Sequence, residues 1–283
     1  MANKTIFNAY NDTKRELMSS GVEDFGFEAR VIIRHITGFD NKKILLNYNN
    51  VLTDYQTEML NKIIARRKER YPLQYILGEW EFYGLKFKVG EGVLIPRPDT
   101  EILVDTALQL IKDIETPKVL DLCAGSGAIG IAVSGNRPDS EVYLLEKSQT
   151  AIGYLVQNIA LNKTTNAKSI SGDVFAGDLS DKKYDLIVSN PPYIKSDDMK
   201  TLQTEVKYEP AMALDGGNDG LDFYKAIVGK YSNSLNNGGS ICFEVGINQA
   251  EDVKKLLVGA GLSGVDTAKD LNGIDRVVFG TVK

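Results

Sequence analysis

The sequence predicts an α/β fold in which a small helical bundle precedes a mostly parallel sheet that ends in an antiparallel strand. Apolar residues recur at helical spacing within residues 1–72. From about residue 117, short apolar strands alternate with helical runs, a pattern typical of a parallel sheet covered by helices on both faces. Near the C-terminus Asn272-Gly273 separates two strand-like runs, which predicts a hairpin and hence an antiparallel last strand.

Composition narrows the class of protein. The 283 residues are 43% hydrophobic and 25% charged, which favours a packed chain of two domains. The net charge of −5 is a poor match for phosphate-rich partners, so we expect no direct nucleic-acid binding. Without a run of about 18 apolar residues or a signal-peptide core, we expect a cytoplasmic protein with no membrane partner. Cys123 and Cys242 have no zinc or disulfide spacing, so we expect buried free thiols and no metal.

Residues 1–72 are predicted to form a helical domain that docks the substrate. Gly38 is a plausible helix end, and Thr53 with Gln56 forms a capping-box pattern before the last long helix. This helix ends in a basic cluster, where the helix dipole favours cations. The cluster is either a solvated helix end or a contact for an acidic or RNA-bearing partner, and it comprises Arg66, Arg67, Lys68 and Arg70.

Residues 73–95 are rich in aromatic and β-branched side chains and are predicted to form a β-hairpin linker, punctuated by Gly78 and Gly84. Residues 96–283 are predicted to form the second domain, which holds the alternating strands and helices. Its first helix follows "IPRPDT", in which Asp99 or Thr100 can cap the helix. Five strands are expected at "KVLDL", "EVYLLE", "SISGDVF", "YDLIVSN" and "SICFEVG".

The stretch "DLCAGSGAIG" predicts a nucleoside-binding loop. Gly125, Gly127 and Gly130 fit the G-x-G-x-x-G pattern, and Glu146 follows at the distance where such a site holds a ribose. The loop offers free N–H donors at a helix N-terminus. The pattern fits NAD as well as other nucleoside cofactors, and tight helix–strand packing alone would explain Gly130. However, a sheet that ends in an antiparallel hairpin resembles the class I methyltransferase fold, which binds S-adenosylmethionine.

The turn "NPPY" ends the fourth strand of the α/β region, where ligands bind in such sheets. Its prolines remove two backbone donors, so the Asn190 side-chain oxygen and the Pro191 carbonyl can both accept from one planar –NH2 group. Tyr193 would add an apolar wall. Two acceptors would aim the nitrogen lone pair at a methyl donor and stabilise the positive charge that grows during transfer. The alternative is a purely structural turn.

Several stretches together resemble the HemK/PrmC family of release-factor glutamine N5-methyltransferases. They are "PLQYILGEWEFYG", "LIPRPDTEILV", "NPPY", "YEPAMALDGGNDGLDFY" and "DLNGIDRVV". The resemblance implies S-adenosyl-L-methionine as methyl donor, with S-adenosyl-L-homocysteine as product. It also implies the glutamine of the Gly-Gly-Gln motif in class I peptide-chain release factors as acceptor.

The family's functional residues carry over by position. The resemblance implies a cofactor site made of Cys123, Ala124, Gly125, Ser126, Gly127, Glu146, Asp173, Val174 and Asn190. It implies a substrate-gripping turn made of Asn190, Pro191, Pro192 and Tyr193. Cys123 stands where glycine is frequent in the family, and Glu146 where aspartate is common. Arg97 would close over the site or order the linker. The loop with Gly216, Gly217 and Gly220 is either flexible or ordered at the rim of the site.

Three other functions make different predictions. A DNA or RNA exocyclic-amine methyltransferase would present the same –NH2 group on a flipped base, but it predicts a broad basic face. A nicotinamide oxidoreductase would need a hydride-handling acid or base near the strand ends, and the sequence has no such constellation there. A non-catalytic binding protein would be expected to lose Asn190 or the glycines, which are intact.

Overall fold

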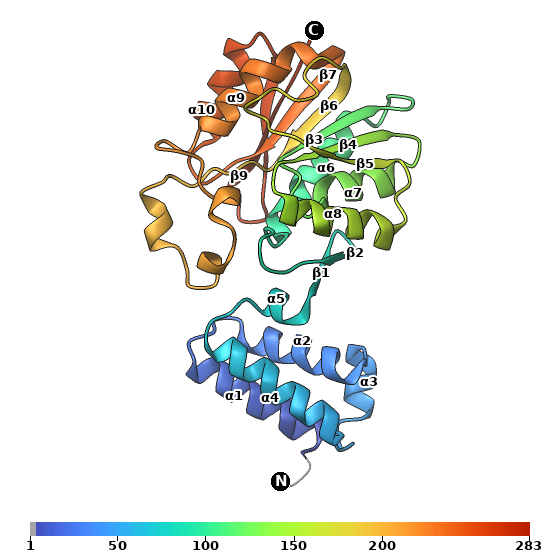
Figure 1. The fold of residues 1–283 in the computed structure, drawn as a ribbon, viewed down its shortest axis with the longest axis vertical. Helices are drawn as coiled ribbons and strands as arrows, with labels where there is room; N and C mark the ends of the chain where they lie inside the picture. Colours follow the sequence, from blue (N-terminus) through green and yellow to red (C-terminus); the bar gives the residue numbers. More distant parts are fainter. Residues whose placement is uncertain (1–3) are drawn as a thin grey trace. The chain divides into compact units, whose positions relative to one another are not determined.

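A computed structural model describes residues 4–283 (Figure 1). Residues 1–3 lie outside the described part. They are the first residues of the predicted helical domain and of the N-terminal segment in which no signal peptide is expected. The chain divides into two compact units. Unit 1 holds the residues up to Gly78 together with Gln203–Tyr208, and unit 2 holds Glu79–Leu202 and Glu209–Lys283. No described helix is both long and apolar enough to cross a membrane.

Unit 1 is a helical bundle, as predicted. Its helices are α1 (Ile6–Ser19), α2 (Phe25–Thr37), α3 (Asn41–Leu46), α4 (Asp54–Lys68) and α5 (Leu73–Leu77). They enclose a core that includes Leu17, Ile32, Ile33 and Leu60. The capping box of Thr53 and Gln56 is present, and Gly38 ends α2 in the left-handed conformation at φ 69°. Helix α5 corrects one prediction, because it occupies the start of the stretch predicted as β structure.

The basic cluster at the end of α4 is only partly a solvated helix end, because Arg66 and Lys68 are exposed but Arg67 is buried. The Arg67 side chain is only 4% exposed and donates to both carboxylate oxygens of Glu28, at 2.6 and 2.9 Å. Arg67 and Arg70 also share Glu205, which belongs to the same unit. Arg66 lies 4.0 Å over the ring of Tyr71. These cations therefore have partners within unit 1. The sequence pattern at the end of a helix cannot predict these pairs, because Glu28 and Glu205 lie far from the cluster in the sequence.

Unit 2 begins with the predicted hairpin. Strands β1 (Glu79–Phe82) and β2 (Leu85–Lys88) pair antiparallel, with Trp80 opposite Phe87. The buried rings of Phe82 and Phe87 pack edge to face at 6.1 Å. They belong to the core cluster under α6, α7 and α8, so the hairpin is part of the unit rather than a free strap.

The main sheet has seven strands in the order β5-β4-β3-β6-β7-β9-β8. The strands are β3 (Lys118–Leu122), β4 (Glu141–Glu146), β5 (Ala167–Ser171), β6 (Tyr184–Ser189), β7 (Leu235–Glu244), β8 (Ser263–Lys269) and β9 (Asp275–Thr281). Strand β9 lies antiparallel between β7 and β8, which confirms the hairpin prediction. Gly273 in its turn has φ 79°, a conformation that glycine adopts without strain.

Helices cover both faces of this sheet (Figure 1). The helices are α6 (Glu101–Leu110), α7 (Ala128–Asn136), α8 (Gln149–Asn162), α9 (Asp222–Tyr231) and α10 (Ala250–Gly259). Side chains of α6, α7 and α8 form one core cluster, and those of α9 and α10 form another. Along β3, Val119 enters the first cluster and Leu120 the second, as the two-residue period of a strand requires. Burial on both faces explains why the strands are almost continuously apolar.

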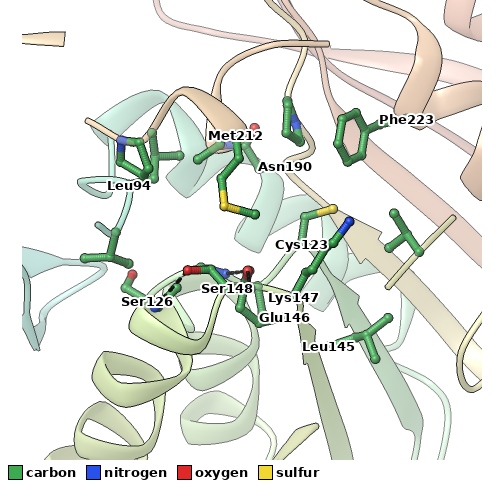
Figure 2. A pocket seen from close by; sticks show the side chains of 18 of the residues that line it. Leu94, Cys123, Ser126, Leu145, Glu146, Lys147, Ser148, Asn190, Met212 and Phe223 are labelled. Carbon is green, nitrogen blue, oxygen red and sulfur yellow. Dashed lines mark hydrogen bonds between the residues drawn. The ribbon is translucent and has the colours of Figure 1, made fainter. Parts of the chain in front are cut away.

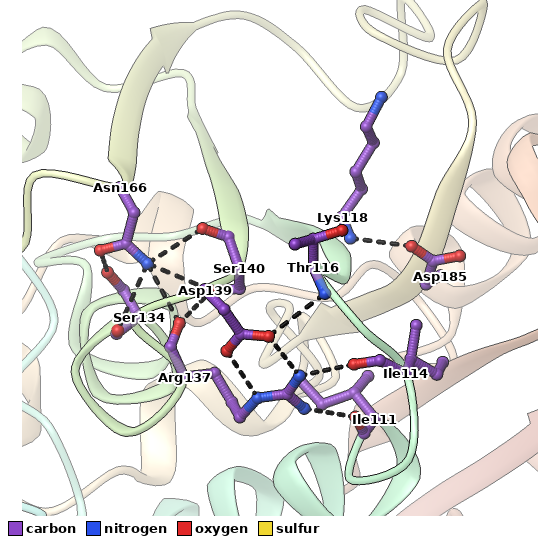
Figure 3. A network of polar contacts seen from close by, with 10 residues as sticks. All are labelled: Ile111, Ile114, Thr116, Lys118, Ser134, Arg137, Asp139, Ser140, Asn166 and Asp185. Atoms are coloured by element: carbon purple, nitrogen blue, oxygen red, sulfur yellow. Dashed lines mark hydrogen bonds and ion pairs between the residues drawn. The ribbon is translucent and has the colours of Figure 1, made fainter.

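A polar network closes the amino-terminal edge of the sheet (Figure 3). Arg137 pairs with Asp139 and donates to the carbonyls of Ile111 and Ile114. The Asn166 amide donates to the carbonyls of Ser134, Arg137 and Ser140 at 3.1–3.3 Å. The polar groups of the loops at this edge therefore form hydrogen bonds with one another. The loops at the carboxyl edge surround a cavity instead.

Candidate active site

A cavity of about 450 Å³ lies within unit 2 at the carboxyl ends of the central strands (Figure 2). This is the size range of small-molecule sites, and its position is where open α/β sheets bind ligands. The loops after β3, β4, β5 and β6 all contribute to its wall. The predicted site residues that line it are Cys123, Ala124, Gly125, Ser126, Glu146, Asp173, Val174, Asn190 and Pro192.

The three fingerprint glycines have different structural reasons. A side chain at Gly127 would meet Leu155 at 2.2 Å, and one at Gly130 would meet Leu144 at 2.6 Å, so both positions are closed by packing. Gly125 also has a positive φ of 55°, but a side chain there would meet no atom within 4 Å. Because Gly125 lines the cavity, it is the glycine that leaves room for a ligand.

Glu146 is held rigidly at the end of β4. Its Oε2 accepts from the Gly125 backbone N–H at 2.8 Å, and its Oε1 accepts from the Ser148 N–H at 2.7 Å. Each carboxylate oxygen has two lone pairs, so both can still accept from a ligand. The carboxylate therefore ties the glycine loop to β4 and keeps acceptor capacity at the cavity, as a ribose site requires.

Cys123 corrects the prediction that both thiols are buried. Cys242 is fully buried, but Cys123 is only half-buried and lines the cavity. Its φ of 59° lies in the left-handed region, which explains why glycine suits this position. Burial raises the pKa of the Cys123 thiol and the nearby carboxylates of Glu146 and Asp121 raise it further, so the group stays a neutral thiol.

Asp121 joins β3 to the helix that follows the glycine loop. It is fully buried at the end of β3, and its Oδ2 accepts from the Gly130 N–H at 2.8 Å. Burial raises the pKa of Asp121 to about 8, while the Gly130 hydrogen bond acts in the opposite direction. The carboxyl is therefore mostly protonated at neutral pH.

We expect Asp121→Asn to flatten the pH dependence of stability. The folded pKa of about 8 exceeds the ordinary value of 3.8, so between these limits the folded state holds a proton that the unfolded state releases. The free energy of unfolding of the native protein should therefore fall as pH rises through this window, whereas the asparagine variant lacks this titration. Urea unfolding across the window, with both proteins in parallel, measures the difference. A difference that does not change with pH would contradict the assignment.

The cavity wall near Val174 includes two aromatic residues that the sequence analysis did not name, Phe175 and Phe223. Asp173 pairs with Lys147 at 2.8 Å, which lowers the pKa of its carboxyl. Phe175 and Phe223 both line the cavity and pack edge to face at 4.8 Å. They form an apolar surface beside Val174, suited to a flat ring. Phe175 follows the predicted Asp173-Val174 pair by one position, a signal that could have located it, whereas the approach of Phe223 is a long-range contact.

The turn after β6 presents Asn190 to the cavity, as predicted. Its Nδ2 donates to Oγ1 of Thr100 at 3.3 Å, which directs Oδ1 away from that bond. Thr100 occupies the N-cap position of α6, one of the two positions predicted, but its side chain makes no capping hydrogen bond to that helix. Pro192 lines the cavity, but Pro191 and Tyr193 are not among its lining residues. The roles given to those two residues stay predictions.

The glycine-rich loop packs directly against this turn. A side chain at Gly216 would lie 2.7 Å from both Pro192 O and Tyr193 Cα, and one at Gly220 would lie 2.4 Å from Tyr193 O. The Ile194 N–H donates to Leu214 O at 2.9 Å, and the Gly216 N–H donates to Ile194 O at 2.8 Å. Of the two alternatives for this loop, the structure supports the ordered rim.

Arg97 pairs with Glu209, whose side chain is almost fully buried and whose Oε2 accepts from the Ile95 N–H at 3.0 Å. Burial raises the pKa of Glu209, and the charge of Arg97 opposes that rise. Ile95, Arg97 and Pro210 all line the cavity. The ion pair thus joins the segment before α6 to the rim, which supports the ordering role considered for Arg97.

Known proteins match both parts of this chain. The family model of the PrmC N-terminal domain matches residues 8–78, and that of the methyltransferase small domain matches residues 99–217. A release factor glutamine methyltransferase of Thermodesulfovibrio yellowstonii is 42% identical over 91% of this chain and 94% of its own. The enzyme of the same description from Geobacter sulfurreducens is 41% identical over 98% and 97%. That of Salmonella typhimurium is 34% identical over 89% and 91%.

Solved structures agree on the fold. The hMettl16 catalytic domain has a TM-score of 0.57 at 14% identity, covering 83% of this chain and 85% of that chain. A methyltransferase from Pyrococcus furiosus has a TM-score of 0.52 at 16% identity, covering 81% and 98%. Together with the antiparallel β9 and the cavity at the strand ends, these likenesses define a class I methyltransferase fold.

The full-length matches are more specific than the fold. The chain belongs to the PrmC/HemK family of release factor glutamine methyltransferases. It is therefore an enzyme, and the hypotheses of a nicotinamide oxidoreductase and of a non-catalytic binding protein are wrong.

Proposed function

We propose that this enzyme transfers a methyl group from S-adenosylmethionine to the side-chain amide nitrogen, N5, of glutamine in the Gly-Gly-Gln motif of class I peptide-chain release factors. The observation that carries the proposal is the Asn190 amide, which lines the cavity beside the glycine loop and turns Oδ1 away from its bond with Thr100. The relatives' shared description as release factor glutamine methyltransferases supports the choice of acceptor.

The cavity fits the donor on three grounds. Gly125 leaves the space that a side chain would fill, and Glu146 offers two fixed oxygens suited to ribose hydroxyls. Phe175 and Phe223 supply an apolar wall suited to adenine. The donor, when bound, supplies a methyl group on a positively charged sulfur. The chain supplies the binding and orientation of the two reactants.

The acceptor side follows from amide chemistry. An amide nitrogen is a poor nucleophile because its lone pair is delocalised into the carbonyl. Asn190 Oδ1 and the Pro191 carbonyl can together hold both N–H bonds, which fixes the direction of the nitrogen and favours the positive charge that develops on it. Holding the two reactants in line is worth up to about 7–11 kcal/mol of the barrier.

Gly125→Ala is expected to weaken donor binding at least tenfold, because the new methyl group would occupy space at the cavity. The left-handed φ of 55° should also lower the free energy of unfolding by about 1–2 kcal/mol. Isothermal titration with S-adenosylmethionine and urea unfolding measure the two effects.

Gly38→Ala is the matched control. Gly38 has φ 69° and equally open space, but it lies in unit 1. This variant should lose similar stability and retain normal donor binding. Equal weakening of donor binding in both variants would contradict the role given to Gly125.

The function itself is tested by mass spectrometry. A purified class I release factor is incubated with the enzyme and S-adenosylmethionine, and its Gly-Gly-Gln peptide is analysed by fragmentation. We expect one added methyl on the glutamine side chain, and none when the release factor carries glutamate at that position. A parallel reaction offers duplex DNA with labelled donor. Label in DNA alone would overturn the proposal.

A further inference from the structure

Gln249 lies in the short segment between the end of β7 and the start of α10, and its side chain is half-buried. It occupies the N-cap position of α10, but the side chain makes no capping hydrogen bond to that helix. Glutamine is also not among the residues favoured at N-caps, which have short side chains such as those of serine, asparagine and aspartate. Helix capping therefore does not explain why this position holds a glutamine.

The Gln249 amide instead forms three hydrogen bonds, each with the backbone of a different loop. Its Oε1 accepts from the Gly246 N–H, just after β7, at 2.9 Å. Its Nε2 donates to the Tyr193 carbonyl at 2.9 Å and to the Gly220 carbonyl at 3.3 Å. Because a backbone N–H only donates and a carbonyl only accepts, these partners fix the orientation of the amide. The side chain thus joins the end of β7, the turn after β6 and the glycine-rich loop.

Glycines at two of these three positions leave the space that the amide occupies. A side chain at Gly246 would lie 2.7 Å from Gln249 Oε1, and one at Gly220 would lie 2.6 Å from Gln249 Nε2. A Cβ atom does not approach an oxygen or nitrogen so closely, so the amide fits only because both neighbours are glycine. The two glycines and the glutamine therefore act together at one close-packed contact.

We propose that Gln249 is a positioning residue that holds the turn after β6 and the glycine-rich loop in fixed places relative to β7, so that Asn190 faces the methyl donor. This inference rests on the function proposed for that turn and names the side chain that supports it. Gln249 does not line the cavity, so it is assigned no contact with the reacting atoms.

The turn needs such support because of its own sequence. Pro191 and Pro192 have no N–H, so neither can donate a hydrogen bond that would hold the turn in place. The carbonyl of the residue that follows them, Tyr193, accepts from Gln249 instead. Asn190 directly precedes the prolines, whose φ angles are fixed, so a shift of the Tyr193 carbonyl would also move the Asn190 side chain.

The first test removes the hydrogen bonds and keeps the approximate size of the side chain. Gln249→Met should lower kcat about 10²-fold, because a shift of about 1 Å in a positioning group is enough for a loss of this size. The dissociation constant for S-adenosylmethionine should be unchanged, since the glycine loop after β3 is intact. Gln249→Glu keeps the acceptor for the Gly246 N–H but, when ionised, has no donor for the two carbonyls, so its kcat should fall as far.

Asn166→Leu is the matched control for lost stability. Asn166 is also half-buried and its amide donates to three backbone carbonyls, but these belong to the network at the amino-terminal edge of the sheet (Figure 3). This variant should melt at a lower temperature than the native protein, as the Gln249 variants should, and keep a normal kcat well below its melting temperature. An equal loss of kcat in Asn166→Leu would show that Gln249 acts only through stability and would overturn the inference.

The second test combines Gln249→Met with Gly220→Ala. A side chain at Gly220 would lie 2.4 Å from the Tyr193 carbonyl oxygen, which is the atom that Gln249 holds. Because both changes displace the same atom, the double variant should be no slower than the slower single variant. Losses that multiply, a normal kcat in either Gln249 variant, or donor binding that weakens in proportion to kcat would each overturn the inference. If Asn190→Ala itself keeps full activity, the proposed function of the turn fails instead.

Discussion

Asn190→Ala is expected to lower kcat for methyl transfer by about 10²–10³-fold, the usual cost of removing one preorganised group that stabilises developing charge. The alanine removes Oδ1, one of the two acceptors for the substrate amide, and leaves the Pro191 carbonyl alone to orient the nitrogen. The glycine loop and Glu146, which are expected to bind the donor, are unchanged. Single-turnover transfer to the release factor and calorimetric titration with S-adenosylmethionine measure the two properties separately.

Asn233→Ala provides a matched control, because Asn233 is an exposed asparagine that does not line the cavity. It should leave transfer and donor binding unchanged. If Asn190→Ala loses donor binding in proportion to activity, Asn190 acts mainly on the donor, and the role proposed for the turn is wrong.

Gly216→Ala and Gly220→Ala are expected to lower kcat by about 10²-fold without loss of donor binding. At both positions the new methyl would collide with backbone atoms of the Pro192-Tyr193 turn, at 2.7 and 2.4 Å, and backbone cannot rotate away as a side chain can. The turn must shift, and a displacement of about 1 Å at a positioning group is enough for a loss of this size. Steady-state kinetics with the release factor measures kcat, and thermal melts show that the variants are folded.

Gly153→Ala is the control for these variants. Gly153 lies in the exposed face of α8, and a side chain there would meet no atom within 4 Å. Alanine should raise the free energy of unfolding by about 0.5–1 kcal/mol and leave kcat unchanged. Normal kcat in both Gly216→Ala and Gly220→Ala would show that the loop is not the support of the turn.

Local chemistry made much of the fold predictable. Thr53 with Gln56 and Asn272-Gly273 are short-range patterns whose geometry depends on neighbouring residues, and both occur as expected. Strand alternation fixed the class of the sheet, because burial on both faces leaves few other arrangements. Leu73–Leu77 was mistaken for β structure because aromatic and β-branched composition does not by itself exclude one helical turn.

The part of the cavity wall that lies at the ends of successive strands was predictable from the sequence. The loops after four strands supply the residues that the motifs named, since carboxyl ends of parallel strands meet at one edge. What the sequence did not reveal depends on contacts across long separations. Thr100 looked like a helix cap because its partner, Asn190, lies 90 positions away.

The most direct test of the account is a crystal structure of the enzyme with S-adenosyl-L-homocysteine and a Gly-Gly-Gln peptide. We predict that the glutamine –NH2 donates to both Asn190 Oδ1 and the Pro191 carbonyl, with its nitrogen facing the cofactor sulfur. A complex in which the glutamine amide lies away from these two oxygens, or in which Asn190 turns Nδ2 toward it, would contradict the central claim.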